Sequence, residues 1–183
     1  MSAPSGTGKS TIIKHLMATR PDLDLKFSIS ATSRKPREGE ENGREYHFLT
    51  KEEFRDKIER GEFVEWEEVY EGTYYGTLLS EVMHKVEQGH TVIMDIDVKG
   101  SINLKKRFGD KALAIFVMPP SIQELETRLR NRGTDTDEEV ARRLAKAGFE
   151  MTYAPQFDSI VINDEFFKAA DEVADKISSF CPA

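Results

Sequence analysis

Short apolar runs, each bounded by charged or turn-forming residues, recur along the chain and are typical of buried strands. They comprise KFSIS at 26–30, TVIMDID at 91–97, ALAIFVM at 112–118 and SIVIN at 159–163. Such nearly continuous apolar runs predict parallel strands that are covered on both faces. Because parallel strands need crossover connections, we expect helices between them.

Helical periodicity fills the intervals between these runs. Apolar residues at helical spacing follow Lys9 and follow Ser121: Ile12, Ile13, Leu16 and Met17 in the first case, and Ile122, Leu125 and Leu129 in the second. Ser121, which comes directly after two prolines, is expected to cap the second of these helices. The alternation of strands and helices predicts one compact α/β unit.

Two segments depart from this pattern. Residues 34–77 are rich in charge and contain the alternating stretches EYHFL, EFVEWEEV and GTYYGT, which predict antiparallel strands in an insertion. Residues 128–143 place five arginines around an acidic Gly/Thr turn, a composition typical of a mobile lid. The alternative interpretation of this second segment is a solvent-facing helix whose ion pairs contribute little to stability.

Composition excludes several classes of protein. The 183 residues carry a net charge of −7 with 38% apolar residues, which is ordinary for a globular protein and argues against non-specific binding to nucleic acid. The longest apolar run, 112–118, is far below the roughly 20 residues of a transmembrane helix. The first ten residues lack the features of a secretory signal. We therefore expect a cytoplasmic protein without membrane contact, in which the lone Cys181 forms no internal disulfide.

The clearest chemical motif is APSGTGKST at residues 3–11, which has the spacing of a phosphate-binding loop with Ala3 at the first glycine position. Gly6 and Gly8 would let backbone N–H groups turn toward phosphate oxygens. Lys9 would reach the β- and γ-phosphates, and the Ser10 hydroxyl would ligate Mg²⁺. The alternative is a glycine-rich helix cap without a ligand.

One element that usually accompanies such a loop is missing from the pattern. Only Met1 and Ser2 precede the loop, whereas a strand usually has about 5 to 6 residues. Either residues upstream of Met1 are absent from this sequence, or another element fills the centre of the sheet. We expect the first core strand to be missing.

Asp95 and Asp97 close the predicted strand at 91–97, and alternation along a strand would place both carboxylates on the same side at its carboxyl end. Ligands gather at this end of parallel α/β sheets. The two carboxylates are therefore candidates to hold Mg²⁺ through water or to accept hydrogen bonds from a nucleobase. The alternative is an ordinary strand-end turn.

The inserted segment carries side chains that suit a nucleoside monophosphate. Arg34 and Arg37, with Tyr46 and Tyr75 further along, suit a phosphate monoester. Glu65 and Thr77 suit guanine, because a carboxylate can accept from N1–H and the 2-amino group while a hydroxyl donates to O6. The alternative for Glu65 is an exposed acidic position on a strand.

In their order along the chain, five motifs resemble the guanylate kinase family: residues 3–11, 27–48, 63–77, 95–100 and 130–144. The resemblance covers nearly the whole chain. It implies an α/β fold, a P-loop kinase core with a parallel sheet flanked by helices, a small mixed GMP-binding insertion and a helical lid. The core would comprise residues 1–30, 78–124 and 145–183, the insertion residues 31–77 and the lid residues 125–144.

The resemblance also implies roles for individual residues. For catalysis these are Lys9, Arg37, Arg132 and Arg143, and for ATP they are Ala3, Pro4, Ser5, Gly6, Thr7, Gly8, Lys9, Ser10, Thr11, Arg128, Asn163 and Asp164. For GMP they are Ser30, Arg34, Arg37, Tyr46, Glu65, Tyr75, Gly76, Thr77, Asp95 and Asp97. Ser10 would hold Mg²⁺ together with the ATP phosphates, with Asp95 or Asp97 acting through water.

The activity implied is Mg²⁺-dependent transfer of a phosphoryl group from ATP to GMP, and to dGMP, by a monomer or a homodimer. Two alternatives are an inactive interaction module of the same fold, and a kinase of this fold with another phosphate acceptor. A complete phosphate loop together with the lid arginines argues against the module, and the pair of Glu65 and Thr77 argues for guanine as the base.

Overall fold

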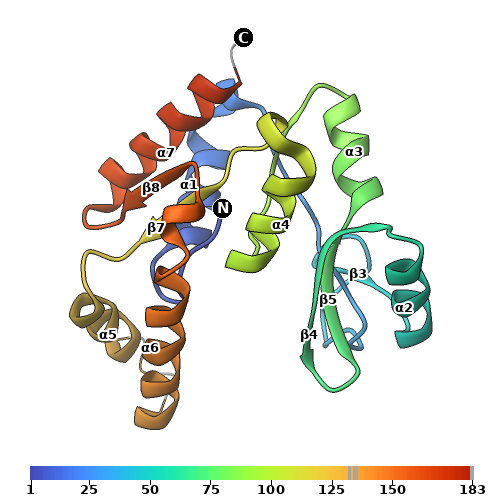
Figure 1. Ribbon diagram of the computed structural model, residues 1–183, viewed down its shortest axis with the longest axis horizontal. Coiled ribbons are helices and arrows are strands. Elements are labelled where there is room, and N and C mark those ends of the chain that lie inside the picture. Colours follow the sequence, from blue (N-terminus) through green and yellow to red (C-terminus); the bar gives the residue numbers. More distant parts are fainter. Residues whose placement is uncertain (132, 134–135, 182–183) are drawn as a thin grey trace. The chain divides into compact units, whose positions relative to one another are not determined.

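The computed structural model describes residues 1–131, 133 and 136–181. The chain divides into two compact units (Figure 1). The first unit contains Met1–Asp24 and Asp95–Ala183, and the second contains Leu25–Met94. Parallel strands occur in both units, so the α/β class predicted from the sequence is confirmed.

The first unit is built on the parallel pair β7 (Ile115–Met118) and β8 (Ser159–Ile162). Ile115 lies opposite Ser159, and Met118 lies opposite Ile162. Both strands are short apolar runs, and β7 contributes the fully buried Phe116 and Val117 to the core. Parallel pairing of this kind places the carboxyl ends of β7 and β8 at the same edge.

Met1 and Ser2 take the strand position on the other side of β7. The amide of Ser2 donates to the carbonyl of Ile115 at 3.0 Å, and the amide of Val117 donates to the carbonyl of Ser2 at 2.8 Å. The amide of Ile96 donates to the carbonyl of Met1 at 3.3 Å. The position that we expected to be missing is thus held by a two-residue extension that leads directly into residues 3–11.

The first unit also contains eight helical segments within its described residues. Their bounds are α1 (Lys9–Thr19), η1 (Pro21–Leu23), α4 (Val98–Phe108), η2 (Gly109–Lys111), α5 (Ile122–Asn131), α6 (Asp137–Met151), η3 (Ala154–Gln156) and α7 (Phe166–Phe180). Helix α7 contacts both α1 and β8. Its buried side chains recur at helical spacing, at Ala169, Ala170, Val173, Ala174 and Ile177. This apolar stripe is what holds α7 in place.

The segment predicted to be a lid forms a helical hairpin of α5 and α6, which lie side by side in Figure 1. Leu125 and Leu129 of α5 pack with Val140 and Ala147 of α6 in a small apolar cluster. The Ser121 hydroxyl accepts a hydrogen bond from the amide of Glu124 at 3.0 Å, which confirms the predicted cap of α5. The hairpin is therefore a packed structure in its own right.

The second unit contains two sheets. β1 (Leu25–Phe27) pairs in parallel with β6 (Thr91–Ile93). The other sheet has the strand order β3-β2-β5-β4, with β2 (Ala31–Thr32), β3 (His47–Phe48), β4 (Phe63–Tyr70) and β5 (Thr73–Leu78). The helices are α2 (Lys51–Glu59) and α3 (Leu79–Glu87). The ring of Phe54 in α2 stacks on those of Phe63 and Tyr74, with ring centres 4.3 Å and 5.4 Å apart, and these rings lie in a core cluster of the unit.

Two predictions about strands are wrong. β2 pairs with β5 and β5 with β4 in antiparallel fashion, as expected, but β3 pairs with β2 in parallel. The connection through residues 33–46 brings the chain back before β3 begins, as parallel pairing requires. β6 ends at Ile93 rather than at residue 97. Within the part of the chain that the structure describes, no helix has the length and apolarity needed to cross a membrane.

Candidate functional site: a phosphate loop and an acceptor cluster

The loop at residues 3–11 has a backbone conformation that only glycine adopts easily. Gly6 and Gly8 both have a φ of 95°, and Gly8 directly precedes α1 without a side-chain cap. The amide of Ile12 donates to the carbonyl of Gly8 at 3.0 Å, which closes the first helical turn. The N–H groups of Lys9 and Ser10 belong to this turn, where a helix has no internal acceptor for them. The loop therefore ends in a helix N-terminus suited to an anion.

Neighbouring side chains crowd both glycines. A Cβ atom on Gly6 would lie 2.8 Å from Cδ2 of Leu129, and one on Gly8 would lie 2.6 Å from Nδ2 of Asn163. The Asn163 contact involves a group that is itself hydrogen-bonded, because Nδ2 donates to the carbonyl of Thr7 at 2.6 Å. The positive φ thus favours glycine at both positions, and at Gly8 a side chain would also displace the hydrogen-bonded amide of Asn163.

Lys9 and Ser10 both reach Asp95. Lys9 forms an ion pair with the Asp95 carboxylate and donates to the carbonyl of Ile96 at 3.3 Å. The Ser10 hydroxyl donates to Oδ2 of Asp95 at 2.7 Å. The side chains of Lys9 and Asp95 are 14% and 24% exposed. A cation and a carboxylate therefore lie next to each other at the C-terminal end of the loop, and both are partly accessible to a ligand.

Asp97 is placed differently from the sequence prediction. The expectation that Asp95 and Asp97 share one side of a strand is wrong, because β6 ends before them and Asp97 is the N-cap of α4. Its Oδ1 accepts a hydrogen bond from the amide of Gly100 at 2.7 Å. An aspartate that caps a helix satisfies orphan N–H groups, and here that demand outweighs strand continuation. Asp95 and Asp97 consequently have different partners.

Ser2 connects the loop to this segment. Its hydroxyl lies 2.8 Å from the carbonyl of Ile96, 2.9 Å from that of Asp97 and 2.6 Å from Oγ of Ser101, and its residue is fully buried. Sequence reasoning missed this residue, because nothing in the local pattern shows which distant carbonyls a serine will meet.

The donor set around Ser10 fits Mg²⁺. Mg²⁺ is usually bound by one or two carboxylates together with water and substrate phosphates. The Ser10 hydroxyl and the Asp95 carboxylate are two neighbouring oxygen donors of this kind. Across residues 1–131, 133 and 136–181, no group of three or more His, Cys, Asp or Glu side chains is arranged to hold a metal ion. The residues present therefore suit a magnesium ion that arrives with phosphate groups.

Residues of the helical hairpin reach the loop. Arg143 donates to the Ser5 hydroxyl at 2.8 Å. Arg128 donates to Oε1 of Glu124 at 2.9 Å and to the carbonyl of Asn163 at 2.8 Å. Asn163 itself is only 5% exposed. Its side chain is thus directed at the loop backbone.

Asp164 and Arg132 are two further members of the predicted set. Asp164 is exposed directly after Asn163. Arg132, predicted to act on the transferring phosphoryl group, lies outside the described residues. The contact of Arg143 with Ser5 is therefore the direct link, within the described part, between a predicted lid arginine and the phosphate loop.

Glu150, in the last turn of α6, is a buried carboxylate that the sequence did not single out. The residue is 8% exposed, and burial raises the pKa of its carboxyl group, although Lys146 and Lys9 oppose the shift. Lys146 lies 3.8 Å from Oε1 of Glu150. No motif marks this position, because its environment is created by the packing of α6.

In the second unit, Glu65 and Thr77 face each other across β4 and β5. The Thr77 hydroxyl donates to Oε1 of Glu65 at 2.8 Å, and Thr77 is 1% exposed. Gly76 is required beside them, because a Cβ there would lie 2.7 Å from the carbonyl oxygen of Glu65. Two side chains that the sequence paired on chemical grounds are thus in direct contact.

A second cluster in this unit gathers Arg34, Tyr46 and Tyr75. The guanidinium of Arg34 lies 5.0 Å from the centre of the Tyr46 ring, and the Tyr46 and Tyr75 rings are 5.8 Å apart. Glu40 pairs with Arg34. Glu40 and the Tyr75 hydroxyl raise the pKa of Arg34 even further above its usual value. Arg37 contributes its backbone amide to Glu40 at 2.7 Å, while its side chain is on an exposed residue.

Ser30 and Glu40 are two further residues of this unit with backbone contacts. Ser30 is half-buried, and its carbonyl accepts a hydrogen bond from the amide of His47 at 2.9 Å. Sequence reasoning missed Glu40. Its spacing, three residues after Arg37, is the one by which acidic side chains often reach back to a backbone amide. That spacing is the signal by which Glu40 could have been found.

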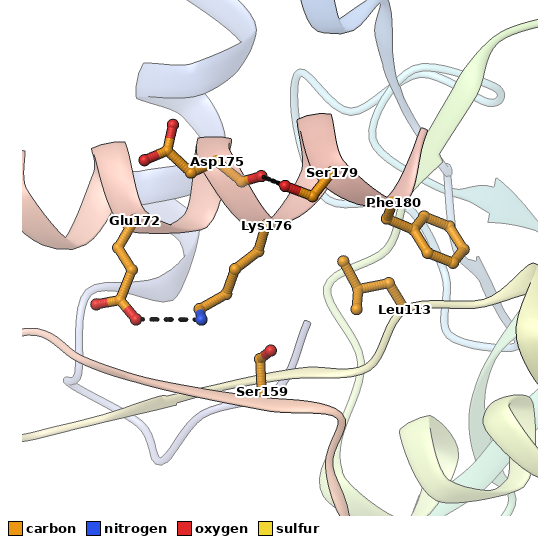
Figure 2. A pocket seen from close by; sticks show the side chains of 7 residues that line it. All are labelled: Leu113, Ser159, Glu172, Asp175, Lys176, Ser179 and Phe180. Atoms are coloured by element: carbon orange, nitrogen blue, oxygen red, sulfur yellow. Dashed lines mark hydrogen bonds and ion pairs between the residues drawn. The ribbon is translucent and has the colours of Figure 1, made fainter. Parts of the chain in front are cut away.

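A shallow hollow of about 420 Å³ lies elsewhere in the first unit, beside the C-terminal half of α7. Figure 2 shows Lys176 extended toward Glu172, and Phe180 beside Leu113. The predicted ATP and catalytic residues are not among those lining it. The hollow is therefore separate from the phosphate loop.

A parallel α/β unit with a glycine-containing loop that runs into a lysine- and serine-bearing helix defines the class of P-loop kinases. Comparisons with known proteins agree with this class. The guanylate kinase family model matches residues 1–180. A guanylate kinase from Bacteroides thetaiotaomicron is 54% identical over 98% of this chain and 87% of its own length. One from Porphyromonas gingivalis is 53% identical over 98% of this chain and 95% of its own length.

A solved structure is similar as well. The crystal structure of guanylate kinase from Anaplasma phagocytophilum has a TM-score of 0.70 and 26% sequence identity, covering 97% of this chain and 82% of that one. The chain belongs to the guanylate kinase family.

Proposed function

We propose that this protein transfers the γ-phosphoryl group of ATP to GMP, and to dGMP, giving ADP and GDP or dGDP. The observation that carries the proposal is the contact between Glu65 and Thr77 in a unit that also contains a phosphate-suited arginine and tyrosine cluster. Family membership supports the same activity. Each part of the proposal assigns a role to residues whose contacts are described above.

Guanine would be read by Glu65 and Thr77. An ionised carboxylate accepts from both N1–H and the 2-amino group, and a hydroxyl can donate to O6. The Thr77 hydroxyl donates its one hydrogen to Oε1 of Glu65 in the structure, so it would turn from Glu65 to O6 when guanine binds. Adenine offers no matching pair of donors, so binding it would leave buried polar groups unpaired. Ser30 would contribute to the same recognition.

The phosphate of GMP would be held by the cluster in the same unit. Arg34 and Arg37 supply positive charge, and Tyr46 and Tyr75 supply hydroxyl donors. Gly76 would let β5 pack closely against β4, because a Cβ there would lie 2.7 Å from the carbonyl oxygen of Glu65. Asp95 or Asp97 would contact GMP from the segment that follows β6. Because the 2′-hydroxyl plays no part in these contacts, dGMP is an expected second acceptor.

ATP would bind at the loop of residues 3–11. The backbone N–H groups at the start of α1 would receive phosphate oxygens, and Lys9 would neutralise charge on the β- and γ-phosphates. Ser10, with Asp95 through water, would hold Mg²⁺, which supplies charge neutralisation across the same phosphates when bound. Asn163, Asp164 and Arg128 would form the surroundings of the adenosine part.

The transfer itself needs little acid–base chemistry. A phosphate monoester loses its second proton with a pKa near 6, so an oxygen of GMP is already anionic at neutral pH. That oxygen forms a bond to the γ-phosphorus, while the bond to the β,γ-bridging oxygen breaks and ADP leaves with its electron pair. Lys9, Arg37, Arg132 and Arg143 would stabilise the charge on the transferring group, and losing one such arginine should lower the rate on the order of a thousandfold.

A panel of acceptors tests the proposal. ADP formation is measured with MgATP and either GMP, dGMP, AMP, UMP, CMP or dTMP, with circular dichroism to verify that the chain is folded. Fast turnover restricted to the guanine nucleotides is the expected result. Fast turnover with another nucleotide instead would identify that nucleotide, rather than GMP, as the acceptor. A folded chain that binds GMP without turnover would favour an interaction module.

A further inference from the structure

Glu40, in the loop between β2 and β3, forms two hydrogen bonds with the guanidinium of Arg34. Its Oε2 accepts from Nη1 of Arg34 at 2.6 Å, and its Oε1 accepts from Nη2 at 2.7 Å. The two side chains are 16% and 17% exposed. Two parallel bonds between a guanidinium and a carboxylate fix orientation as well as distance, which a single ion pair does not.

Glu40 also fixes the backbone on the far side of Pro36. Its Oε2 accepts from the amide of Arg37 at 2.7 Å. One carboxylate therefore holds both the side chain of Arg34 and the main chain of Arg37, the two arginines expected to bind the phosphate of GMP. Its hydrogen bonds to both donors keep this carboxylate from moving independently of either.

The position of Arg34 is in turn linked to the aromatic residues around it. Its guanidinium lies over the rings of Tyr46, at 5.0 Å, and Phe48, at 5.5 Å. Cation–π contacts of this kind depend on where the guanidinium is held. Within the described part of the chain, Nε of Arg34 is buried and has no hydrogen-bond acceptor.

We propose that Glu40 is a positioning residue, which holds Arg34, and through it the Tyr46 ring, in the geometry that receives the phosphate of a nucleoside monophosphate. This inference rests on the proposed function, because the GMP phosphate is the group that the cluster would bind. Glu40 does not touch that phosphate. It prearranges the long, flexible arginine side chain, so that less conformational freedom is lost when the phosphate binds.

The charge of Glu40 is constant under working conditions. Arg34 and the amide of Arg37 lower the pKa of the Glu40 carboxyl group to about 2. Its contribution is therefore present above the ordinary carboxyl pKa and is lost only as the pH falls toward 2. Any change in GMP binding near neutral pH then has another source, such as the second ionisation of the phosphate.

A competing idea gives a different outcome. If the Glu40 carboxylate merely occupied the Arg34 fork and competed with the incoming phosphate, its removal would strengthen GMP binding. Positioning predicts the reverse. The two ideas can therefore be separated by the sign of one measured change.

The experiment measures GMP binding to the full chain by calorimetry without ATP, together with KM for GMP and for ATP. Glu40→Gln should weaken GMP binding and raise KM for GMP at least about tenfold, while KM for ATP changes less than about twofold. The matched control is Glu45→Gln. Glu45 lies in the same loop and likewise accepts from a backbone amide, that of Glu41 at 2.7 Å, and from an arginine, Arg44, at 2.6 Å.

A double-mutant cycle tests whether Glu40 acts through Arg34. In an Arg34→Ala background, Glu40→Gln should change GMP binding less than about twofold, because the group that it positions is gone. Glu40→Asp keeps the charge on a shorter side chain and should give an intermediate loss. This variant keeps the test valid if Glu40→Gln lowers the melting temperature.

Three results would overturn the inference: unchanged or tighter GMP binding by Glu40→Gln, an equal loss in Glu45→Gln, or an undiminished effect in the Arg34→Ala background. A parent protein that does not bind GMP would overturn the proposed acceptor, and this inference with it. A parent that binds GMP without turnover would overturn the proposed reaction alone, because the binding comparison would still be measured.

Discussion

The phosphate loop and the acceptor cluster present two ways to build an anion site. The loop is contiguous in sequence, residues 3–11, and its geometry comes from backbone: two glycines at a φ of 95° and the start of α1. The acceptor cluster, formed by Arg34, Tyr46, Tyr75, Glu65 and Thr77, comes from side chains on separate strands and loops. Glu40 pairs with Arg34, and Thr77 donates a hydrogen bond to Glu65. The first kind of site depends on main-chain conformation, the second on side-chain partners.

This difference extends to charge. The loop gains positive potential from peptide dipoles that need no counter-ion, and the charge of Lys9 at its end is paired with Asp95. In the acceptor cluster, the positive charge of Arg34 is accompanied by the negative charge of Glu40. The acceptor phosphate would therefore be bound by side chains whose positions depend on other side chains, whereas the phosphates of ATP can be bound by the backbone. Substitutions in the two regions should therefore affect different kinetic constants.

The largest effect is expected at Lys9. Lys9→Met removes the cation closest to the loop, so kcat should fall about 100- to 1,000-fold, the usual loss for one group that stabilises developing charge. GMP binding, measured by calorimetry, should change much less than kcat, because Glu65, Thr77 and Arg34, which would bind GMP, lie in the other unit. Lys14→Met is the matched control, since Lys14 is an exposed residue of the same helix. A comparable loss in both variants would remove the special role of Lys9.

The next largest effect is expected for Glu65→Gln. The amide would present donors to the donors of guanine, so kcat/KM for GMP should fall about 100-fold, at about 1–3 kcal/mol for each unsatisfied buried polar group. KM for ATP should not change. Glu67→Gln, on the same strand and exposed, serves as the control. Equal losses for GMP and ATP in the Glu65 variant would indicate general damage to the fold.

A smaller effect is expected for Asn163→Asp. The new carboxylate would face the carbonyl of Thr7, which now accepts from Nδ2 at 2.6 Å, so two acceptors would oppose each other. We expect KM for ATP to rise about tenfold, the scale of one lost hydrogen bond with an added repulsion. KM for GMP should stay the same. A change in both constants, or in neither, would mean that Asn163 does not support the loop.

The two regions also differ in how far sequence predicts them. The loop could be recognised because glycines, lysine and serine at fixed spacing directly encode backbone geometry. The α/β class and the cap at Ser121 were likewise readable from local pattern, and both are confirmed. The assigned roles of the site residues remain predictions.

Long-range partners could not be read in the same way. Glu40 is one of several acidic residues in a charge-rich loop, and only the folded chain shows that it pairs with Arg34. Ser2 takes the place of a strand because it meets the carbonyl of Ile115 and the segment at Ile96, both distant in sequence. The predicted strand at 91–97 is too long, because the apolar pattern does not reveal that Asp97 will cap α4. These errors share one cause: tertiary contacts decide between local alternatives that are close in energy.

The smallest expected effect compares two carboxylates whose pKa values shift in opposite directions. The pKa of Glu40 is lowered by two donors, whereas burial raises the pKa of Glu150 near Lys9. A carboxyl whose pKa is raised on folding destabilises the fold when it is ionised, so its contribution worsens as the pH rises through the unfolded and folded pKa values.

Glu150→Gln should therefore raise the melting temperature by a few degrees at pH 7, at about 2–4 °C per kcal/mol. The gain should shrink as the pH falls below the ordinary glutamate range, because the parent residue is then protonated as well. Melting curves of the parent and Glu150→Gln at several pH values measure this. A pH-independent difference, or destabilisation at pH 7, would show that the ionised carboxylate is adequately paired and that its burial carries no penalty.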